Sequence, residues 1–218
     1  MPADAAIFDL DGVLADSREA FARCVNAALA GAGFAERPAE ELHPFLGPPL
    51  RGTFLQLTGD DALAAECLDA YRERYREHSA AETTVPDGVA DAVRQLAQRM
   101  PLAVATSKAR ALSVPLLRAL GLLDSFAVVE GPALDAHFET KAQTIGRALL
   151  GLPAGASPVM VGDTRFDVEG AHAHGLPCVG VLWGIGSEEE LREAGADAVA
   201  ATPEELVALV TGVPEAAR

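Results

Sequence analysis

The sequence changes its pattern after the stretch Val85-Pro86-Asp87-Gly88, and this change limits the folds that the chain can adopt. Short apolar runs alternate with helical stretches from there onward, and the runs span residues 102–106, 126–129, 158–161 and 178–182. Continuous apolar runs that alternate with helices predict parallel strands covered by helices on both faces. Residues 5–8 form a run of the same type, so they are predicted to join the same sheet. We therefore expect an α/β fold with a Rossmann-like, doubly wound parallel sheet.

Residues 16–84 show no convincing strand. Their apolar positions recur at helical spacing, and helices are expected at 16–31, 38–46, 49–58 and 60–79. This helical block interrupts the chain between the first strand and the others. The predicted division is therefore a core domain made of residues 1–15 and 85–218, with an inserted helical domain at residues 16–84. Tyr71 and Tyr75 lie four residues apart in this block, a spacing typical of core positions.

Composition excludes several classes of partner. The formal net charge of −15 argues against nucleic acid or an anionic membrane, because binding to those surfaces depends on cationic side chains. The sequence has no basic-then-apolar leader and no run of 18 apolar residues, so we expect a cytoplasmic protein. Cys24, Cys67 and Cys178 have no metal-ligand spacing and are expected to be buried free thiols. The chain is expected to be a monomer or a homodimer.

Acidic side chains follow two of the predicted strands. Asp9 and Asp11 come after the first strand, Asp163 comes after a later one, and Asp167 follows four residues on. Ligands of open parallel sheets bind beyond the carboxyl ends of the strands, so these carboxylates are predicted to converge. Four carboxylates so close together need a cation, and a modest number of oxygen ligands favours Mg²⁺.

The chain has two lysines against fifteen arginines, and both are predicted to lie at this same edge of the sheet. Lys108 follows Thr106 and Ser107 at the end of a strand, and Lys141 begins a helix. A hydroxyl group, loop backbone N–H groups such as that of Gly12, and a compact ammonium group suit a phosphoryl ligand. Residues 106–108 and Lys141 are therefore candidates for binding phosphate.

Together these motifs resemble the haloacid dehalogenase superfamily over the whole chain. The resemblance is carried by Asp-x-Asp-Gly-x-Leu-x-Asp-Ser at residues 9–17, Thr-Ser-Lys at 106–108, Lys141, and Gly-Asp-x-x-x-Asp at 162–167. The helical block is similar to the small cap that the family inserts after its first strand. Gly47-Pro48-Pro49-Leu50, together with the glycine-rich stretch at 180–187, resembles the phosphoglycolate-phosphatase-like and 5′-nucleotidase-like branch.

The resemblance implies roles for the acidic residues. Asp9 matches the nucleophile that becomes an aspartyl phosphate, and Asp11 matches the general acid and base. Mg²⁺ would be held by the Asp9 carboxylate, the Asp11 backbone carbonyl and Asp163, with Asp167 direct or through water. The ion would screen the repulsion between the nucleophile and the phosphate.

It also implies roles for the phosphate-binding residues. Thr106 and the Ser107 amide match the groups that hold the transferring phosphoryl, and Lys141 matches the charge-stabilising lysine, with Lys108 as the second candidate. Ala142 follows Lys141 where the family often has proline, although this branch also uses Lys-Ala. Arg51 in the helical block is a candidate for contacting a carboxylate or phosphate of the substrate.

The resemblance implies Mg²⁺-dependent hydrolysis of a small phosphorylated metabolite, either phosphoglycolate or a nucleoside monophosphate. Four alternatives remain open at this stage. A phosphomutase similar to β-phosphoglucomutase would use the same residues, and a metal-independent dehalogenase would not need Asp11. A non-catalytic relic would be expected to have lost Asp9 or Asp11. A receiver-type signalling domain would lack the helical block.

Overall fold

The computed structural model describes residues 3–48, 50–134 and 139–212. Its backbone contacts separate two units along the chain. One unit comprises Met1–Ala15 and Val85–Arg218, and the other comprises Asp16–Thr84. We call them the core unit and the helical unit and describe each by itself.

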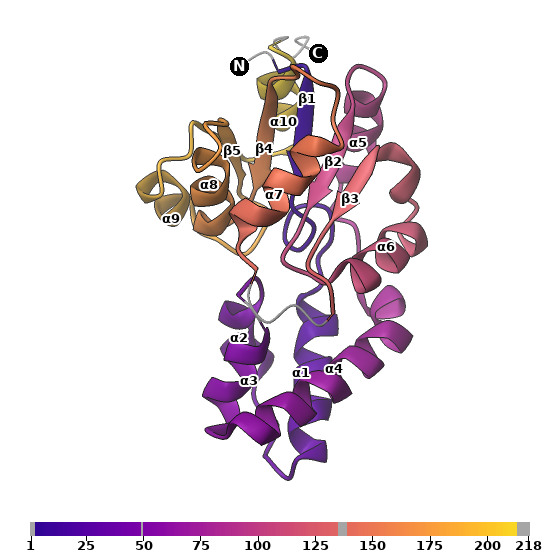
Figure 1. Cartoon of the computed structure of the whole chain (residues 1–218), viewed down its shortest axis with the longest axis vertical. Coiled ribbons are helices and arrows are strands. Elements are labelled where there is room, and N and C mark those ends of the chain that lie inside the picture. The colour runs from indigo at the N-terminus through magenta and orange to yellow at the C-terminus, as the bar shows by residue number, and fades with distance from the viewer. Residues whose placement is uncertain (1–2, 49, 135–138, 213–218) are drawn as a thin grey trace. The chain divides into compact units, whose positions relative to one another are not determined.

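A parallel sheet forms the centre of the core unit (Figure 1). Within the described residues it has six strands in the order β3-β2-β1-β4-β5-β6. Their bounds are β1 Ala5–Phe8, β2 Leu102–Ala105, β3 Val128–Glu130, β4 Pro158–Gly162, β5 Cys178–Val181 and β6 Ala198–Ala200. Ile7 of β1 pairs with Ala103 on one side and with Met160 on the other. The predicted parallel α/β sheet is confirmed, and β1 is an internal strand.

Helices cover both faces of this sheet. They are α5 Val89–Ala97, α6 Arg110–Ala119, α7 Lys141–Leu150, α8 Arg165–His172, α9 Glu188–Glu193 and α10 Pro203–Thr211, with a 3₁₀ turn η2 at Leu123–Ser125. One core cluster joins alternate residues of the strands, such as Ile7 and Met160, to Ile145 of α7, Val168 of α8 and Leu191 of α9. Helices α5 and α10 pack against each other, and α10 also contacts β5 and β6. This two-sided cover confirms the doubly wound arrangement.

The helical unit contains α1 Arg18–Gly31, α2 Ala39–Leu42, the 3₁₀ turn η1 His43–Phe45, α3 Leu50–Thr58 and α4 Asp61–Glu82. Its centre is aromatic: Tyr71 stacks on Tyr75 at 5.4 Å between ring centroids and meets the edges of Phe21 and Phe54 at 6.0 Å. Both tyrosines are buried, as their spacing predicts. The carboxylate of Asp60 accepts the N–H groups of the first turn of α4 and so fixes where that helix begins.

The two ends of the helical unit are joined by backbone pairing. The Asp16 N–H donates to the Thr84 carbonyl at 2.8 Å, and the Thr84 N–H donates to the Asp16 carbonyl at 3.2 Å. The sequence gives no strand signal here, because a two-residue bridge leaves no periodic pattern. The pairing nevertheless brings the first and last residues of the unit together.

The three cysteines are buried and form no disulfide, as expected. In the part of the chain that the structure describes, no helix combines the length and apolarity needed to cross a bilayer.

Candidate active site

The carboxyl end of β1 turns sharply and delivers two aspartates. Asp9 continues the sheet for one more hydrogen bond, from its N–H to the Val161 carbonyl at 2.9 Å. The Leu10 carbonyl then accepts the N–H groups of residues 13, 14 and 15, which closes a tight loop. Gly12 stands in this loop with φ of 83°, in the left-handed region that favours glycine. The loop places the side chains of Asp9 and Asp11 at the edge of the sheet.

Asp163 is supplied by the turn after β4, and Asp167 by the first turn of α8. Both side chains are fully buried. Asp167 Oδ2 accepts the backbone N–H groups of Asp163 at 3.2 Å and Thr164 at 3.1 Å, and the Thr164 hydroxyl at 3.0 Å. Gly162 leaves room for this turn, because a Cβ there would lie 2.1 Å from the Asp167 Cβ. The sequence therefore folds back locally to point two carboxylates to one place.

Three of the predicted acidic residues meet in space. Asp9, Asp163 and Asp167 each offer a carboxylate oxygen, and these oxygens lie within 4.8 Å of one another. Lys141 Nζ lies 2.8 Å from Asp9 Oδ1 and 2.8 Å from Asp167 Oδ1. We call these four residues the carboxylate cluster. Thr140 and Gln143 form a capping box that begins α7 at Lys141.

Burial makes the charges of this cluster costly. It raises the pKa of Asp9 to about 6, although Lys141 opposes the shift. Burial, reinforced by the charges of Asp167 and Asp9, raises the pKa of Asp163 well above its usual value. Burial also acts to lower the pKa of Lys141, but the two neighbouring carboxylates more than offset it and raise that pKa. Three ionised carboxylates and one ammonium group leave a net charge of about −2, which a divalent cation would neutralise.

The donor set fits a hard cation. Asp163 Oδ1 is buried and accepts no hydrogen bond from the described residues. A buried carboxylate oxygen without a donor is rare in folded proteins, and a bound ion is one of its ordinary explanations. All the ligand atoms are carboxylate oxygens, as Mg²⁺ prefers, whereas zinc sites usually include histidine or cysteine.

The second lysine pairs with the remaining aspartate. Lys108 Nζ lies 2.5 Å from Asp11 Oδ1, and both side chains are almost buried. The Lys108 N–H donates to the Thr106 hydroxyl oxygen at 3.1 Å. Thr106 is buried, and a hydroxyl group that accepts one hydrogen bond can still donate its own hydrogen. Ser107 lies between them in the loop that follows β2. The structure thus separates the two lysines, which sequence reasoning left as rivals for one role.

Arg51 belongs to the helical unit, at the start of α3. Its Nη2 contacts both carboxylate oxygens of Asp61, at 2.8 and 2.7 Å, on the exposed surface. The carboxylate cluster belongs to the other unit, the core unit, so contact between Arg51 and the substrate stays a prediction. In the motif next to it, Pro49 lies outside the described residues.

The stretch that follows β5 also contacts the carboxylate cluster, and the sequence analysis did not include it among the site residues. The Ile185 N–H, in the stretch after β5, donates to Asp163 Oδ2 at 2.7 Å. The sequence signal that could have indicated it is the pair Gly184 and Gly186, at the end of a strand on the same sheet edge.

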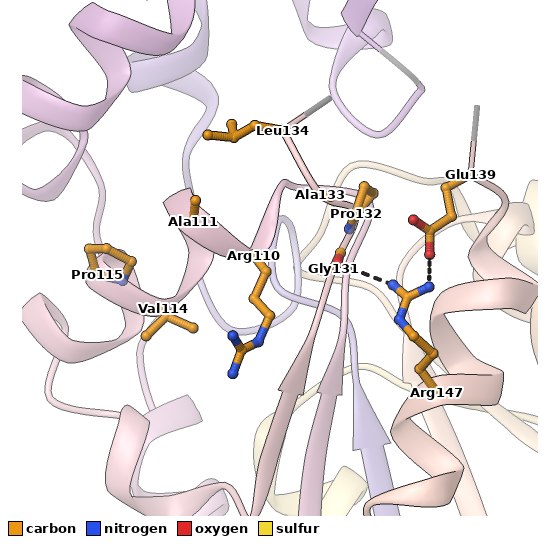
Figure 2. A pocket seen from close by; sticks show the side chains of 10 residues that line it. All are labelled: Arg110, Ala111, Val114, Pro115, Gly131, Pro132, Ala133, Leu134, Glu139 and Arg147. Carbon is orange, nitrogen blue, oxygen red and sulfur yellow. Dashed lines mark hydrogen bonds and ion pairs between the residues drawn. The ribbon is translucent and has the colours of Figure 1, made fainter. Parts of the chain in front are cut away.

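A pocket of about 700 Å³ lies on the core unit, and none of the predicted site residues lines it. Figure 2 shows the side chains that line it. It is lined by Arg110, Ala111, Val114, Pro115, Gly131, Pro132, Ala133, Leu134, Glu139 and Arg147. The charge of Arg147 is satisfied within the protein, by Glu139, by Glu130 and by the Gly131 carbonyl. Arg110 donates its Nε hydrogen to the Val129 carbonyl at 2.9 Å.

Comparison with known proteins agrees with this geometry. Residues 6–181 match the family described as haloacid dehalogenase-like hydrolases. The chain belongs to this family. It is 39% identical, over 85% of its length and 86% of the relative's, to a protein of Pseudomonas aeruginosa named 5′-nucleotidase. It is 35% identical to a protein of Mycobacterium tuberculosis named tyrosine-protein kinase PtkA, over 92% of this chain and 70% of that one.

A solved structure shares the fold closely. The crystal structure of a predicted phosphatase from Clostridium acetobutylicum superposes with a TM-score of 0.87 at 32% identity. The match covers 95% of this chain and 97% of that one. As a haloacid dehalogenase-like hydrolase, the chain is an enzyme whose family implies a small phosphorylated substrate, and its relatives include proteins named phosphatases.

Proposed function

We propose that the chain is a Mg²⁺-dependent phosphomonoesterase that acts through an aspartyl phosphate on Asp9. The observation that carries the proposal is the carboxylate cluster, in which Asp9 lies beside Lys141 among carboxylates that can hold a cation. Phosphoglycolate and nucleoside monophosphates are the proposed substrates. The relative named 5′-nucleotidase supports testing nucleoside monophosphates first.

Asp9, Asp163 and the backbone carbonyl of Asp11 would hold the ion, with Asp167 direct or through water. When bound, Mg²⁺ lowers the electrostatic repulsion between two anions, the nucleophile and the phosphate. Lys141 supplies a positive charge that the protein itself fixes beside Asp9, and we propose that it stabilises the charge that develops on the transferring phosphoryl.

The covalent step uses a carboxylate oxygen of Asp9. That oxygen attacks phosphorus, the ester P–O bond breaks, and the leaving oxygen takes a proton from Asp11. Water then attacks the aspartyl phosphate while Asp11 takes a proton back. Inorganic phosphate leaves and the Asp9 carboxylate is restored.

The residues at the end of β2 are proposed to position the phosphoryl group. Thr106 is held by the Lys108 N–H and can donate its own hydroxyl hydrogen to a phosphate oxygen. The backbone N–H groups of Ser107 and of the loop at Gly12 complete the proposed donor set. Fixed donors of this kind cost no reorganisation during the reaction. We propose that the helical unit serves as the cap that selects the substrate.

The proposal is tested by phosphate release from a panel of phosphomonoesters, with Mg²⁺ and with EDTA. The panel holds nucleoside monophosphates, phosphoglycolate, sugar phosphates and an aryl phosphate. We expect release that requires Mg²⁺ and that is abolished in Asp9→Asn, whose fold should be unchanged by circular dichroism. Activity in EDTA, or near-normal activity of Asp9→Asn, would refute the mechanism.

The relative named a tyrosine-protein kinase makes a second arm of the experiment necessary. The protein is incubated with ATP and a tyrosine-containing polypeptide, and phosphotyrosine is measured beside inorganic phosphate. The same panel includes a sugar phosphate whose isomer is sought, as the test for a mutase. We expect inorganic phosphate and neither phosphotyrosine nor an isomerised sugar phosphate.

A further inference from the structure

The segment Trp183–Gly186 follows β5 and wraps around Asp163, which follows the neighbouring strand β4. The Ile185 N–H donates to Asp163 Oδ2 at 2.7 Å, while Oδ1 of the same carboxylate is buried without a hydrogen-bond donor among the described residues. One carboxylate oxygen is therefore fixed by the protein and the other is left for a ligand. Such an arrangement is typical of a metal ligand that is oriented by a neighbouring group.

Two glycines allow the segment to come this close. A Cβ on Gly184 would lie 2.3 Å from the Asp163 Cβ, and a Cβ on Gly186 would lie 2.0 Å from the Asp163 carbonyl oxygen. Neither glycine has a positive φ, so the requirement is for space and not for an unusual backbone conformation. Gly12, in the loop after β1, meets Asp163 as well, since its Cβ would lie 2.0 Å from Oδ2.

The segment is anchored along its length. Trp183 donates its indole N–H to the Val13 carbonyl at 3.0 Å, which ties the segment to the loop that carries Asp9 and Asp11. Ser187 accepts the Glu190 N–H at 3.1 Å and so caps α9, the next element of the chain. The position of the Ile185 N–H is therefore set by the strand before it, the helix after it and the tryptophan between them.

We propose that Trp183, Gly184, Ile185 and Gly186 are positioning residues that hold Asp163 ready to bind the metal ion. They act through Asp163 and are not themselves ligands. The inference rests on the proposed metal site. The test of the inference therefore measures Mg²⁺ affinity directly. A failure of the positioning role can then be distinguished from a failure of the proposed function.

The experiment compares Mg²⁺ binding by the wild type, Gly184→Ala and Gly186→Ala, using calorimetry on the full chain after treatment with EDTA. We expect the two alanine variants to bind Mg²⁺ about 10- to 100-fold more weakly, the usual effect of disturbing a group that orients a ligand. Gly31→Ala is the matched control, because nothing lies within 4 Å of the Cβ position at Gly31. Its affinity should equal that of the wild type.

Trp183→Phe is the second variant, because it keeps an aromatic ring, although a smaller one, and removes the indole N–H that donates to Val13. We expect it to fold and to bind Mg²⁺ several-fold more weakly, which keeps the proposal testable if the glycine variants fail to fold. Trp183 is also the sole tryptophan of the chain, so its fluorescence reports on this segment. Addition of Mg²⁺ should change that fluorescence in the wild type and leave it unchanged in Asp163→Asn.

The outcomes separate cleanly. If the wild type binds Mg²⁺ and a folded Gly184→Ala or Trp183→Phe binds it equally well, the positioning role is overturned. If the wild type itself binds no Mg²⁺, the proposed metal site fails first, and the positioning role fails with it.

Discussion

Lys108 and Asp11 form an ion pair, with 2.5 Å between Nζ and Oδ1, while the chain's other lysine lies between Asp9 and Asp167. The two lysines thus neutralise different carboxylates. Lys141 compensates two members of the carboxylate cluster, and Lys108 compensates the proposed general acid and base. We therefore expect different effects from substituting Lys141 and from substituting Lys108.

We expect Lys141→Gln to destabilise the metal-free protein by about 3–5 kcal/mol, because it leaves two buried carboxylates without their counter-charge. Excess Mg²⁺ should recover much of this loss, since the ion supplies the missing charge. Lys108→Gln also breaks a buried pair, but Mg²⁺ should recover less of its stability. Urea unfolding with EDTA and with Mg²⁺ measures the stability of both variants. If Mg²⁺ restored the stability of both equally, the two lysines would not have the separate roles described here.

Asp11→Asn should slow turnover by at least about 100-fold, the usual scale of general acid–base catalysis. The amide cannot protonate the leaving oxygen or accept a proton from water. Because Asp11 offers the ion only its backbone carbonyl in the proposal, Mg²⁺ affinity should change little. Steady-state kinetics measures the turnover, and calorimetry measures the Mg²⁺ affinity. A rate within a few-fold of the wild type would remove Asp11 from its proposed role.

The raised pKa of Asp9 predicts how Mg²⁺ binding depends on pH. Its folded-state pKa is about 6, against an ordinary value of 3.8. The metal-free folded protein therefore holds a proton that the unfolded chain has released, and its stability should fall as pH rises from about 4 to about 6. Mg²⁺ competes with that proton, so its stabilising effect should grow over the same range.

Melting temperatures with and without Mg²⁺, at about pH 5 and about pH 7.5, test this dependence. The rise caused by Mg²⁺ should be larger at the higher pH. Asp9→Asn has no proton to release at position 9 and serves as the control, in which the rise caused by Mg²⁺ should depend less on pH. A shift that is independent of pH in the wild type would show that Asp9 does not bind the ion.

Gly170 in α8 is expected to resist substitution, although alanine in a helix interior is usually about 1 kcal/mol better than glycine. A Cβ at Gly170 would lie 2.9 Å from Lys141 Cγ and 3.0 Å from Ile145 Cδ1. Gly170→Ala should therefore lose the usual gain in stability and reduce turnover by displacing Lys141. Gly31→Ala, at an open position, should be neutral or slightly stabilising and fully active. Urea unfolding and turnover of both variants are compared.

Arg51→Gln should raise the KM for the best substrate several-fold and leave kcat nearly unchanged, if Arg51 contacts a remote anionic group of that substrate. Its exposed pair with Asp61 contributes less than about 1 kcal/mol, so stability should hardly change. Asp61→Asn breaks the same pair and is the control. An unchanged KM in Arg51→Gln would leave Arg51 as a surface cation.

The architecture of the core unit and the identity of the acidic residues could be predicted from the amino-acid sequence. Apolar runs between helices predict a parallel sheet wherever they occur, and the ends of such strands share one edge. The convergence of Asp9, Asp163 and Asp167 at this edge of the sheet could therefore be predicted from the sequence. The helical insertion followed in the same way, from the absence of strand patterns between residues 16 and 84.

The pairing of the charged groups, in contrast, becomes visible only in the folded chain. Lys108 and Lys141 have similar surroundings in the sequence, and their partners, Asp11 in one case and Asp9 with Asp167 in the other, come from segments far along the chain. The contact of Ile185 with Asp163 was equally hidden, because a backbone N–H carries no sequence signature. Periodicity records which residues face the core, whereas hydrogen bonds across loops depend on where the folded strands end.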